Sequence, residues 1–304
     1  MALIIWPDVY VLLGGRLFHG MAVALGLGTA TAWLTERLGD PVRAAWWSSF
    51  TTAAAFGGGG LITTIAVATG GGGLAPWSYH LGFVLLVLVG ILLWRVPGGT
   101  SGSSGRWLRL PTFPPGTRLF TLGNALSWSV SGTILAAGPA AFAAAGMPTG
   151  AGIGVFVLCG TGAFVQLMPR LRPSDPRLGV LYGALCSTSA LVLFDLGVRA
   201  SNPVLLLCGC ACAGAAGFGF MYLAGLTAVN AAAGDRRAAA VSGYLLWSYI
   251  GFGGPCLLVG WLSDRFGEVT ALTWSAAVVA LAFSILLLVI RARPTPVVAA
   301  APPG

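Results

Sequence analysis

The sequence predicts an all-α integral membrane protein, and three observations lead to that prediction. Of the 304 residues, 57% are apolar and only 8% are charged, whereas a soluble domain carries about 25% charged residues. Nine segments are long and apolar enough to cross a bilayer as helices, which takes roughly 20 residues each. The arginines alternate between the connections as they do in membrane proteins. Since so few charges cannot cover a surface that faces water, most of the surface is expected to face lipid.

The expected membrane helices follow one another with short connections. They cover residues 9–35, 45–69, 77–95, 118–145, 149–169, 177–198, 202–231, 238–262 and 268–291. Membrane helices tolerate glycine and proline because neighbouring helices satisfy the freed backbone groups. Two groups of such residues are therefore expected to bend the second and eighth helices: Gly57, Gly59, Gly60, Gly251, Gly253, Gly254 and Pro255.

The basic residues predict the orientation. All sixteen are arginines, and thirteen of them lie in every second connection or in the C-terminal tail. The arginine-rich connections are 36–44, 95–118, 170–177 and 232–237, and the poor ones are 70–76, 146–148, 199–201 and 263–267. Because arginine-rich connections stay on the cytoplasmic side, the C-terminus is predicted to be cytoplasmic in a cell membrane, and the start of the chain to lie outside. This even spread argues against a nucleic-acid interface, where basic residues gather in one patch.

A polar segment separates the expected helices into two groups. Residues 96–117 are rich in Gly, Ser, Pro and Arg, a composition typical of a flexible linker. We therefore predict a partial N-terminal bundle of three helices (1–95), a cytoplasmic linker (96–117), a C-terminal bundle of six helices (118–291) and a disordered cytoplasmic tail (292–304).

An internal repeat relates the two groups. Residues 43–60 align without gaps to residues 237–254, and both stretches lead from a cytoplasmic arginine into a helix. The identical pairs are Arg43/Arg237, Ala44/Ala238, Ala45/Ala239, Ser48/Ser242, Gly57/Gly251, Gly59/Gly253 and Gly60/Gly254. The second and eighth helices therefore correspond, which is typical of two parallel six-helix halves. On this interpretation the chain holds the last nine helices of a twelve-helix architecture.

Three segments carry a resemblance to a known family. They are Leu13–Gly20, in which Arg16 precedes a glycine by four residues, Gly234–Ser242, and Gly251–Gly267. In these segments the chain resembles helices four to twelve of a major facilitator superfamily transporter. The resemblance implies a 6+6 helix architecture, reduced here to 3+6, that moves a small molecule by alternating access. The composition is also similar to that of a bacterial member from a high-GC genome. Gly60-Leu61 stands where the drug-antiporter motif has a proline, which leaves the direction of transport open.

The first expected helix holds two candidate residues for the substrate path. Arg16 lies inside an apolar run, where a charge costs at least about 2.5–3.5 kcal/mol unless it faces a cavity or a partner. Arg16 either lines a central cavity or extends to the membrane surface. His19 is three residues further on, on the same helical face, and either exchanges protons near neutral pH or packs as a buried, hydrogen-bonded side chain.

Asp195 is the one acidic residue well inside an expected span. Proton coupling usually needs such a carboxylate, so Asp195 is a candidate coupling residue. Arg199 follows four residues later, which also fits an ion pair on one helical face.

A second set of candidates lies in the C-terminal group. Asn124, Trp128 and Ser131 recur at spacings of four and three, so they share one helical face. In the resembling fold this is the seventh helix, which lines the substrate path; the alternative is hydrogen bonding between helices. Three further aromatic residues are candidates for the walls of a substrate site or for packing: Tyr222, Tyr244 and Trp247.

The cysteines do not suggest a metal site. All six lie in apolar runs, and the series Cys208, Cys210 and Cys212 has no His or acidic residue nearby. A helix would turn these three thiols in different directions, so we interpret them as small packing residues. No metal and no cofactor is expected.

These observations favour a secondary transporter, not an enzyme, for a small amphipathic molecule. Proton coupling is predicted because the sequence contains no nucleotide-binding loop of the type G-x-x-x-x-G-K-[ST], and export is favoured over import. The expected partners are the lipid bilayer, the substrate and protons, without nucleic acid. The alternatives are a non-transporting remnant of such a transporter, a channel, or an intramembrane enzyme. The sequence shows no charge ring or filter repeat of a channel and no catalytic cluster of an enzyme.

Overall fold

The structure is a computed structural model that describes residues 37–70, 76–95, 111–168, 175–233 and 236–292, with isolated positions before residue 37. Within these ranges all regular structure is helical and no strand occurs. Eight of the described helices are long and apolar enough to cross a membrane. The predicted all-α protein with several membrane spans is confirmed at this level, whereas the 3+6 arrangement stays a prediction. The described residues do not include Arg16 or His19.

The chain divides into two compact units, unit 1 (Met1–Leu108) and unit 2 (Arg109–Gly304). The boundary falls within the polar segment 96–117. Unit 1 contains α3 (Pro41–Ala68) and α4 (Trp77–Trp94). The first of these runs without interruption through Gly57, Gly59 and Gly60, so their expected bend does not break the helix.

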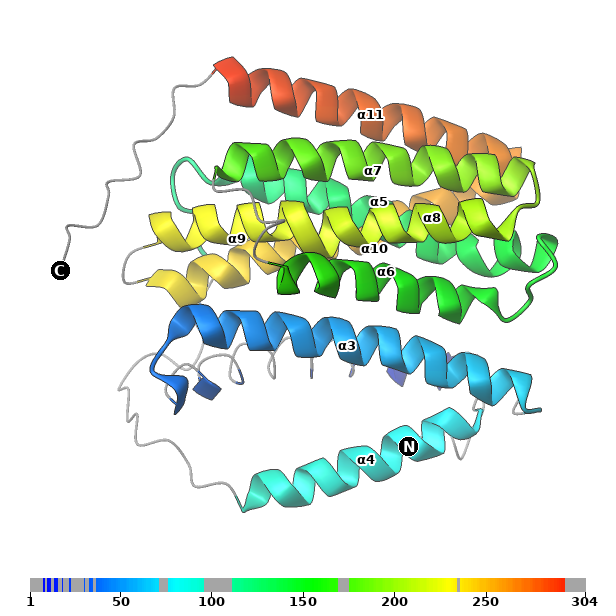
Figure 1. The fold of residues 1–304 in the computed structure, drawn as a ribbon, viewed down its shortest axis with the longest axis horizontal. Helices are drawn as coiled ribbons and strands as arrows, with labels where there is room; N and C mark the ends of the chain where they lie inside the picture. The colour runs from blue at the N-terminus through cyan, green and yellow to red at the C-terminus, as the bar shows by residue number, and fades with distance from the viewer. Residues whose placement is uncertain are drawn as a thin grey trace. The chain divides into compact units, whose positions relative to one another are not determined.

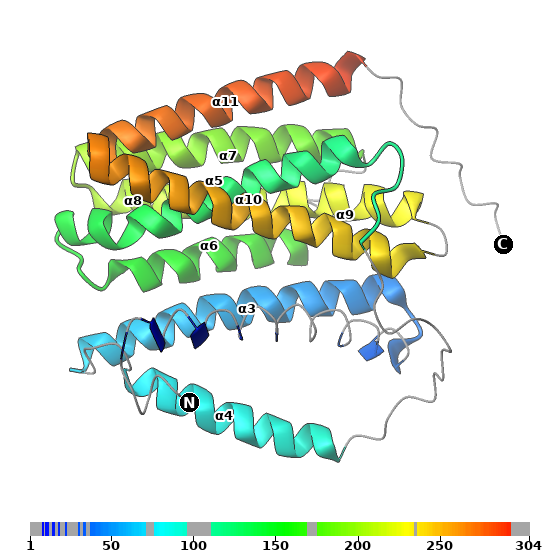
Figure 2. The same ribbon diagram turned by 180° about the vertical axis from the view of Figure 1, so that it is seen from behind.

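Unit 2 holds six membrane spans that run alongside one another (Figures 1 and 2). Its elements are α5 (Arg118–Ala144), α6 (Gly150–Leu167), α7 (Pro176–Arg199), α8 (Pro203–Gly214), η2 (Ala215–Phe220), α9 (Met221–Ala232), α10 (Arg237–Phe266) and α11 (Glu268–Ala292). The elements α8, η2 and α9 are one continuous span of 30 residues. The span Pro203–Ala232 contains a π-helical turn in its middle, and the other five are α-helical throughout.

Three spans begin with the same pair of residues, an Asp or Asn followed by proline. The side-chain oxygen of Asp40 accepts a hydrogen bond from the backbone N–H of Arg43 (3.1 Å), and that of Asp175 accepts one from Arg177 (2.8 Å). Asn202 caps α8 in the same way, through the N–H groups of Val204 and Leu205. The following proline suits the first helical position because its missing N–H would have no partner there. These pairs fix where α3, α7 and α8 begin.

The helices α5 and α10 make the most extensive contact in unit 2, and glycine makes that contact possible. A Cβ atom on Gly132 would overlap the carbonyl oxygen of Phe252, and one on Gly251 would overlap that of Ala125. The Cys256 thiol also donates to the Gly132 carbonyl (3.1 Å). Small residues let membrane helices approach this closely. The helix α10 continues through Gly253, Gly254 and Pro255 as one element.

We expect Gly132→Ala to lower the free energy of unfolding by about 1–3 kcal/mol, because the added methyl group forces α5 and α10 apart. Gly260→Ala is the matched control, since nothing lies within 4 Å of its Cβ position in the partner helix α10. That change is expected to be neutral or stabilising by up to about 1 kcal/mol, because alanine favours the helix. Thermal unfolding midpoints of both variants in one detergent test this; equal midpoints would contradict it.

Candidate functional site

The candidate site is built around the π-helical turn η2, in the middle of the span Pro203–Ala232. A π-turn is rare and occurs frequently at functional sites, because it disrupts the regular ladder of backbone hydrogen bonds. The apolar sequence of this span predicts a plain membrane helix. The local signal is weak, consisting only of Gly217 and Gly219 alternating with Phe218 and Phe220.

Two side chains from neighbouring helices bind the backbone of the π-turn. The indole N–H of Trp128, from α5, donates to the carbonyl of Gly217 (2.8 Å). The amide nitrogen of Gln166, from α6, donates to the carbonyl of Phe218 (2.6 Å). Both donors are buried, so they supply partners that lipid cannot offer. We call this pair of bonds the π-turn clips.

The π-turn also packs tightly against α6. A Cβ atom on Gly214 would overlap the carbonyl oxygen of Leu158, and one on Gly162 would overlap the side chain of Phe218. The hydroxyl of Thr161 donates across the same interface to the carbonyl of Ala211 (2.9 Å). The π-turn is therefore held by shape as well as by its two clips.

An aromatic cluster extends from the π-turn to α10. The ring centroid of Trp128 lies 5.1 Å from that of Phe218, 5.3 Å from Tyr249 and 6.1 Å from Phe252. The contacts to Tyr249 and Phe252 are edge-on, a geometry that aromatic rings favour. Trp128 is buried, whereas Tyr249 is 40% exposed and the two phenylalanines are half-buried. The cluster offers apolar ring faces and one phenol, with no carboxylate among its four residues.

A chain of hydrogen bonds lies beside this cluster. The amide nitrogen of Asn124 donates to the hydroxyl of Ser248 (2.6 Å), which donates to the carbonyl of Tyr244 (2.9 Å). The Tyr244 hydroxyl then donates to the carbonyl of Tyr222 (2.9 Å). Asn124, Ser248 and Tyr244 are buried in unit 2. The chain therefore joins α5, α10 and α9 through their interior faces.

These contacts locate the candidate residues of the C-terminal group. Asn124 and Trp128 both bond to other helices, whereas Ser131 contacts the carbonyl of Ser127 on its own helix (3.5 Å). Tyr244 faces the interior, beside Gly225, and Trp247 is 40% exposed. The structure brings Trp128 together with Tyr249 and Phe252, two residues that the sequence analysis did not single out.

Asp195 lies in an ion pair near the end of α7. Its carboxylate accepts from the Arg199 guanidinium (2.8 Å) and from the Thr273 hydroxyl of α11 (3.2 Å). The guanidinium in turn donates to Thr273 (2.6 Å). The three side chains link α7 to α11, and they lie apart from the π-turn.

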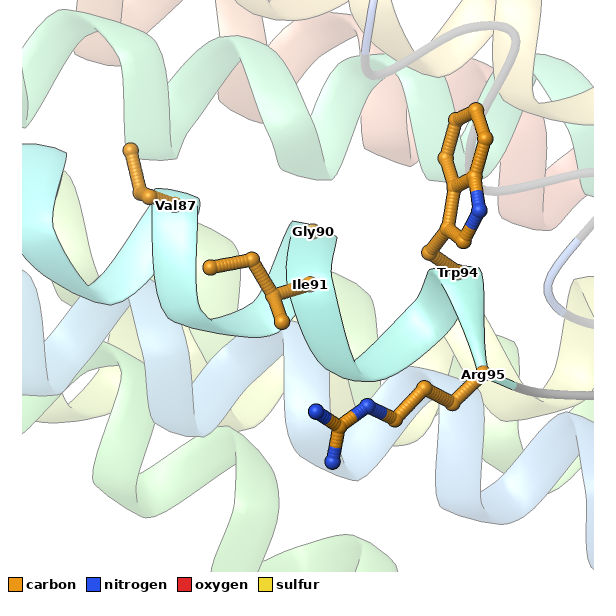
Figure 3. A pocket seen from close by; sticks show the side chains of 5 residues that line it. All are labelled: Val87, Gly90, Ile91, Trp94 and Arg95. Carbon is orange, nitrogen blue, oxygen red and sulfur yellow. The ribbon is translucent and has the colours of Figure 1, made fainter.

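A hollow lies on α4, in unit 1 (Figure 3). All the residues that line it come from that single helix: Val87, Gly90, Ile91, Trp94 and Arg95. No polar group from another described element lines it. Trp94 and Arg95 stand at the helix end, which is typical of an anchor at the membrane surface.

The described residues bring no group of three His, Cys, Asp or Glu side chains close enough to hold a metal ion. The cysteine series on α8 is turned in several directions, with Cys208 exposed, Cys210 buried and Cys212 half-buried. What the site offers is therefore aromatic surface and hydrogen-bonded backbone.

Comparison of the chain with protein-family models, curated proteins and solved structures gave no match in any of the three. The resemblance to the major facilitator superfamily therefore stays a prediction, resting on the segments Leu13–Gly20, Gly234–Ser242 and Gly251–Gly267.

We expect Trp128→Phe to lower the free energy of unfolding by about 1–3 kcal/mol, because it keeps a ring but leaves the buried Gly217 carbonyl without its donor. Gln166→Leu should act in the same direction through Phe218. Trp274→Phe is the matched control, since Trp274 is exposed and its indole nitrogen donates to no described residue. Thermal unfolding and hydrogen exchange of a peptide covering 215–222 test this. Equal effects of Trp128→Phe and Trp274→Phe would refute the role of the clips.

Proposed function

We propose that this protein is a secondary transporter of the major facilitator type in the cytoplasmic membrane, which moves a small amphipathic molecule by alternating access. The observation that supports this most is the aromatic cluster on the π-turn. It lies in the middle of a membrane span and draws its residues from three elements, α5, η2 and α10. Transporters bind substrate near the bilayer midplane, where irregular helices meet.

The chemistry of the cluster suits an amphipathic molecule with an aromatic or apolar part. Ring faces bind flat apolar groups, and the partly exposed Tyr249 supplies a hydroxyl that bonds to no described residue. The two π-turn clips fix the backbone that carries Phe218. A shift of the π-turn would therefore move the ring of Phe218 relative to that of Trp128. The π-turn and its aromatic rings would thus form a local element whose packing can change between the two states of alternating access.

The proposed energy source is the proton gradient. It is supported by the absence of a nucleotide-binding loop from the sequence. Among the candidates for coupling, Asp195 is committed to Arg199 and Thr273, and His19 lies outside the described residues. We therefore propose His19, in the expected helix 9–35, as the proton-binding residue in preference to Asp195.

In proteoliposomes with an imposed pH gradient, we expect flux of at least one dye in a panel of amphipathic aromatic dyes, above that of protein-free liposomes. Tyr249→Ala is expected to lower this flux at least fivefold because it removes the exposed ring of the cluster. Trp274→Ala, an exposed aromatic outside the cluster, is the control and should keep it. Flux in both directions is measured. Flux that ignores the pH gradient would remove proton coupling, and no flux for the whole panel would favour the non-transporting alternative.

Asp195→Asn is expected to keep both flux and its dependence on the pH gradient within about twofold of the unmodified protein. The side chain of Arg199 is 47% exposed and that of Asp195 is 14% exposed, and an asparagine amide oxygen at this position still accepts from Arg199 and Thr273. Asp264→Asn, at the exposed end of α10, serves as the control. Flux that persists but no longer responds to pH in Asp195→Asn alone would make Asp195 the coupling residue.

A further inference from the structure

A short strap leads into α5 and lies against the beginning of α10. The strap comprises residues 111–117, with the sequence Pro-Thr-Phe-Pro-Pro-Gly-Thr. Figure 2 shows it running from the N-terminal end of α5 to that of α10. The backbone N–H of Thr112 donates to the carbonyl of Ala239 (3.0 Å), in the first turn of α10. Segments far apart in the sequence are joined here by a backbone hydrogen bond.

Glycine at position 243 makes room for the strap. A Cβ atom on Gly243 would lie 2.5 Å from the carbonyl oxygen of Thr112 and 3.0 Å from the ring of Phe113. Any side chain at this position would therefore push the strap away. Three other glycines of α10 have no such close contact, since nothing lies within 4 Å of the Cβ position of Gly253, Gly254 or Gly260.

The strap is stiff between its two attachment points. Three prolines restrict its backbone, and Thr117 closes its end by donating from both its N–H and its hydroxyl to the carbonyl of Pro114. Gly116 adopts a φ of 83°, which turns the chain into α5. A stiff segment fixed at α5 transmits any displacement to α10.

One group in the strap opposes its docking. The side-chain oxygen of Thr112 is buried without a hydrogen-bond partner in the described part of the chain. A buried hydroxyl without a partner destabilises the arrangement that buries it. The docked strap is thus held by one backbone bond and a glycine contact, and is weakened by this hydroxyl.

The end of α10 that the strap contacts leads directly to the aromatic cluster. Tyr244, next to Gly243, donates to the carbonyl of Tyr222, and Tyr249 and Phe252 follow on the same helix. From Gly243 to Tyr249 the helix rises only about 9 Å. A shift of the first turns of α10 therefore reaches the rings that contact Trp128.

We propose that the strap is a clasp that docks on Gly243 and releases, and that its docking fixes the position of α10 and of the aromatic rings it carries. The released state frees the beginning of α10. The clasp rests on contacts within unit 2 and does not depend on the transport activity proposed above. On this proposal residues 111–113 connect the linker to α5 and also control the position of α10.

The experiment is hydrogen exchange of the full chain in lipid nanodiscs, followed in peptides that cover the strap and residues 239–249. Gly243→Ala is expected to speed exchange of the Thr112 amide by at least about tenfold, because that amide loses its bond to Ala239, and to speed exchange at the beginning of α10. Because alanine favours the helix more than glycine does, the substitution by itself would slow exchange in α10. Faster exchange there would therefore report the loss of the docked strap. Gly260→Ala, which adds the same methyl group to the same helix in open space, should change neither peptide.

A second variant tests the opposite direction. Thr112→Val keeps the backbone N–H and the shape of the side chain but removes the buried hydroxyl, so it is expected to slow strap exchange by about tenfold. Strap exchange that is equal in Gly243→Ala and Gly260→Ala would overturn the docking contact. Faster strap exchange without any change in α10 would overturn the coupling to α10. Both outcomes are read without a transport substrate.

Discussion

The constraint on which the rest of the structure depends is that a membrane span must satisfy its own backbone. Lipid offers no hydrogen-bond partners, so a π-turn inside a span requires donors from elsewhere in the protein. Trp128 and Gln166 supply them to Gly217 and Phe218. Their two parent helices must then lie within reach of η2, which determines how α5 and α6 pack against the span that contains it.

The glycines of unit 2 help to meet the same constraint, because they allow neighbouring helices to approach closely. Close approach at Gly132, Gly162 and Gly214 brings neighbouring helices near enough for Cys256 to bond to Gly132 and for Thr161 to bond to Ala211. Each of these bonds joins a side chain to a backbone carbonyl of another helix. In this bundle the glycines allow the close approach that the hydrogen bonds between helices require, so the two kinds of residue act together.

The sequence predicts the spans well because length and apolar composition decide them locally. The expected helix 118–145 corresponds to Arg118–Ala144, and the expected 202–231 to Pro203–Ala232. The face on which Trp128 lies also follows from spacing alone. Its partners do not, because Gly217, Phe218 and Tyr249 come from two other parts of the chain. The π-turn escapes prediction for the same reason, since its stability derives from donors that no local pattern contains. Similarly, the interior position of Tyr244 depends on Gly225, about twenty residues earlier.

The π-turn also sets the rotational phase of everything that follows it in the same span. A π-turn holds one residue more than an α-helical path would need, which rotates the remainder by about 100°. The faces of α9 are therefore out of step with those of α8, and Tyr222 presents its carbonyl to Tyr244 only in this phase. If residues 215–220 were wound as a regular α-helix, Tyr222 and Gly225 would turn away from α10 by about 100°, whereas deletion of one of these residues would give a regular helix and keep both facing α10. The extra residue that the π-turn accommodates therefore determines which side of α9 faces the rest of the bundle.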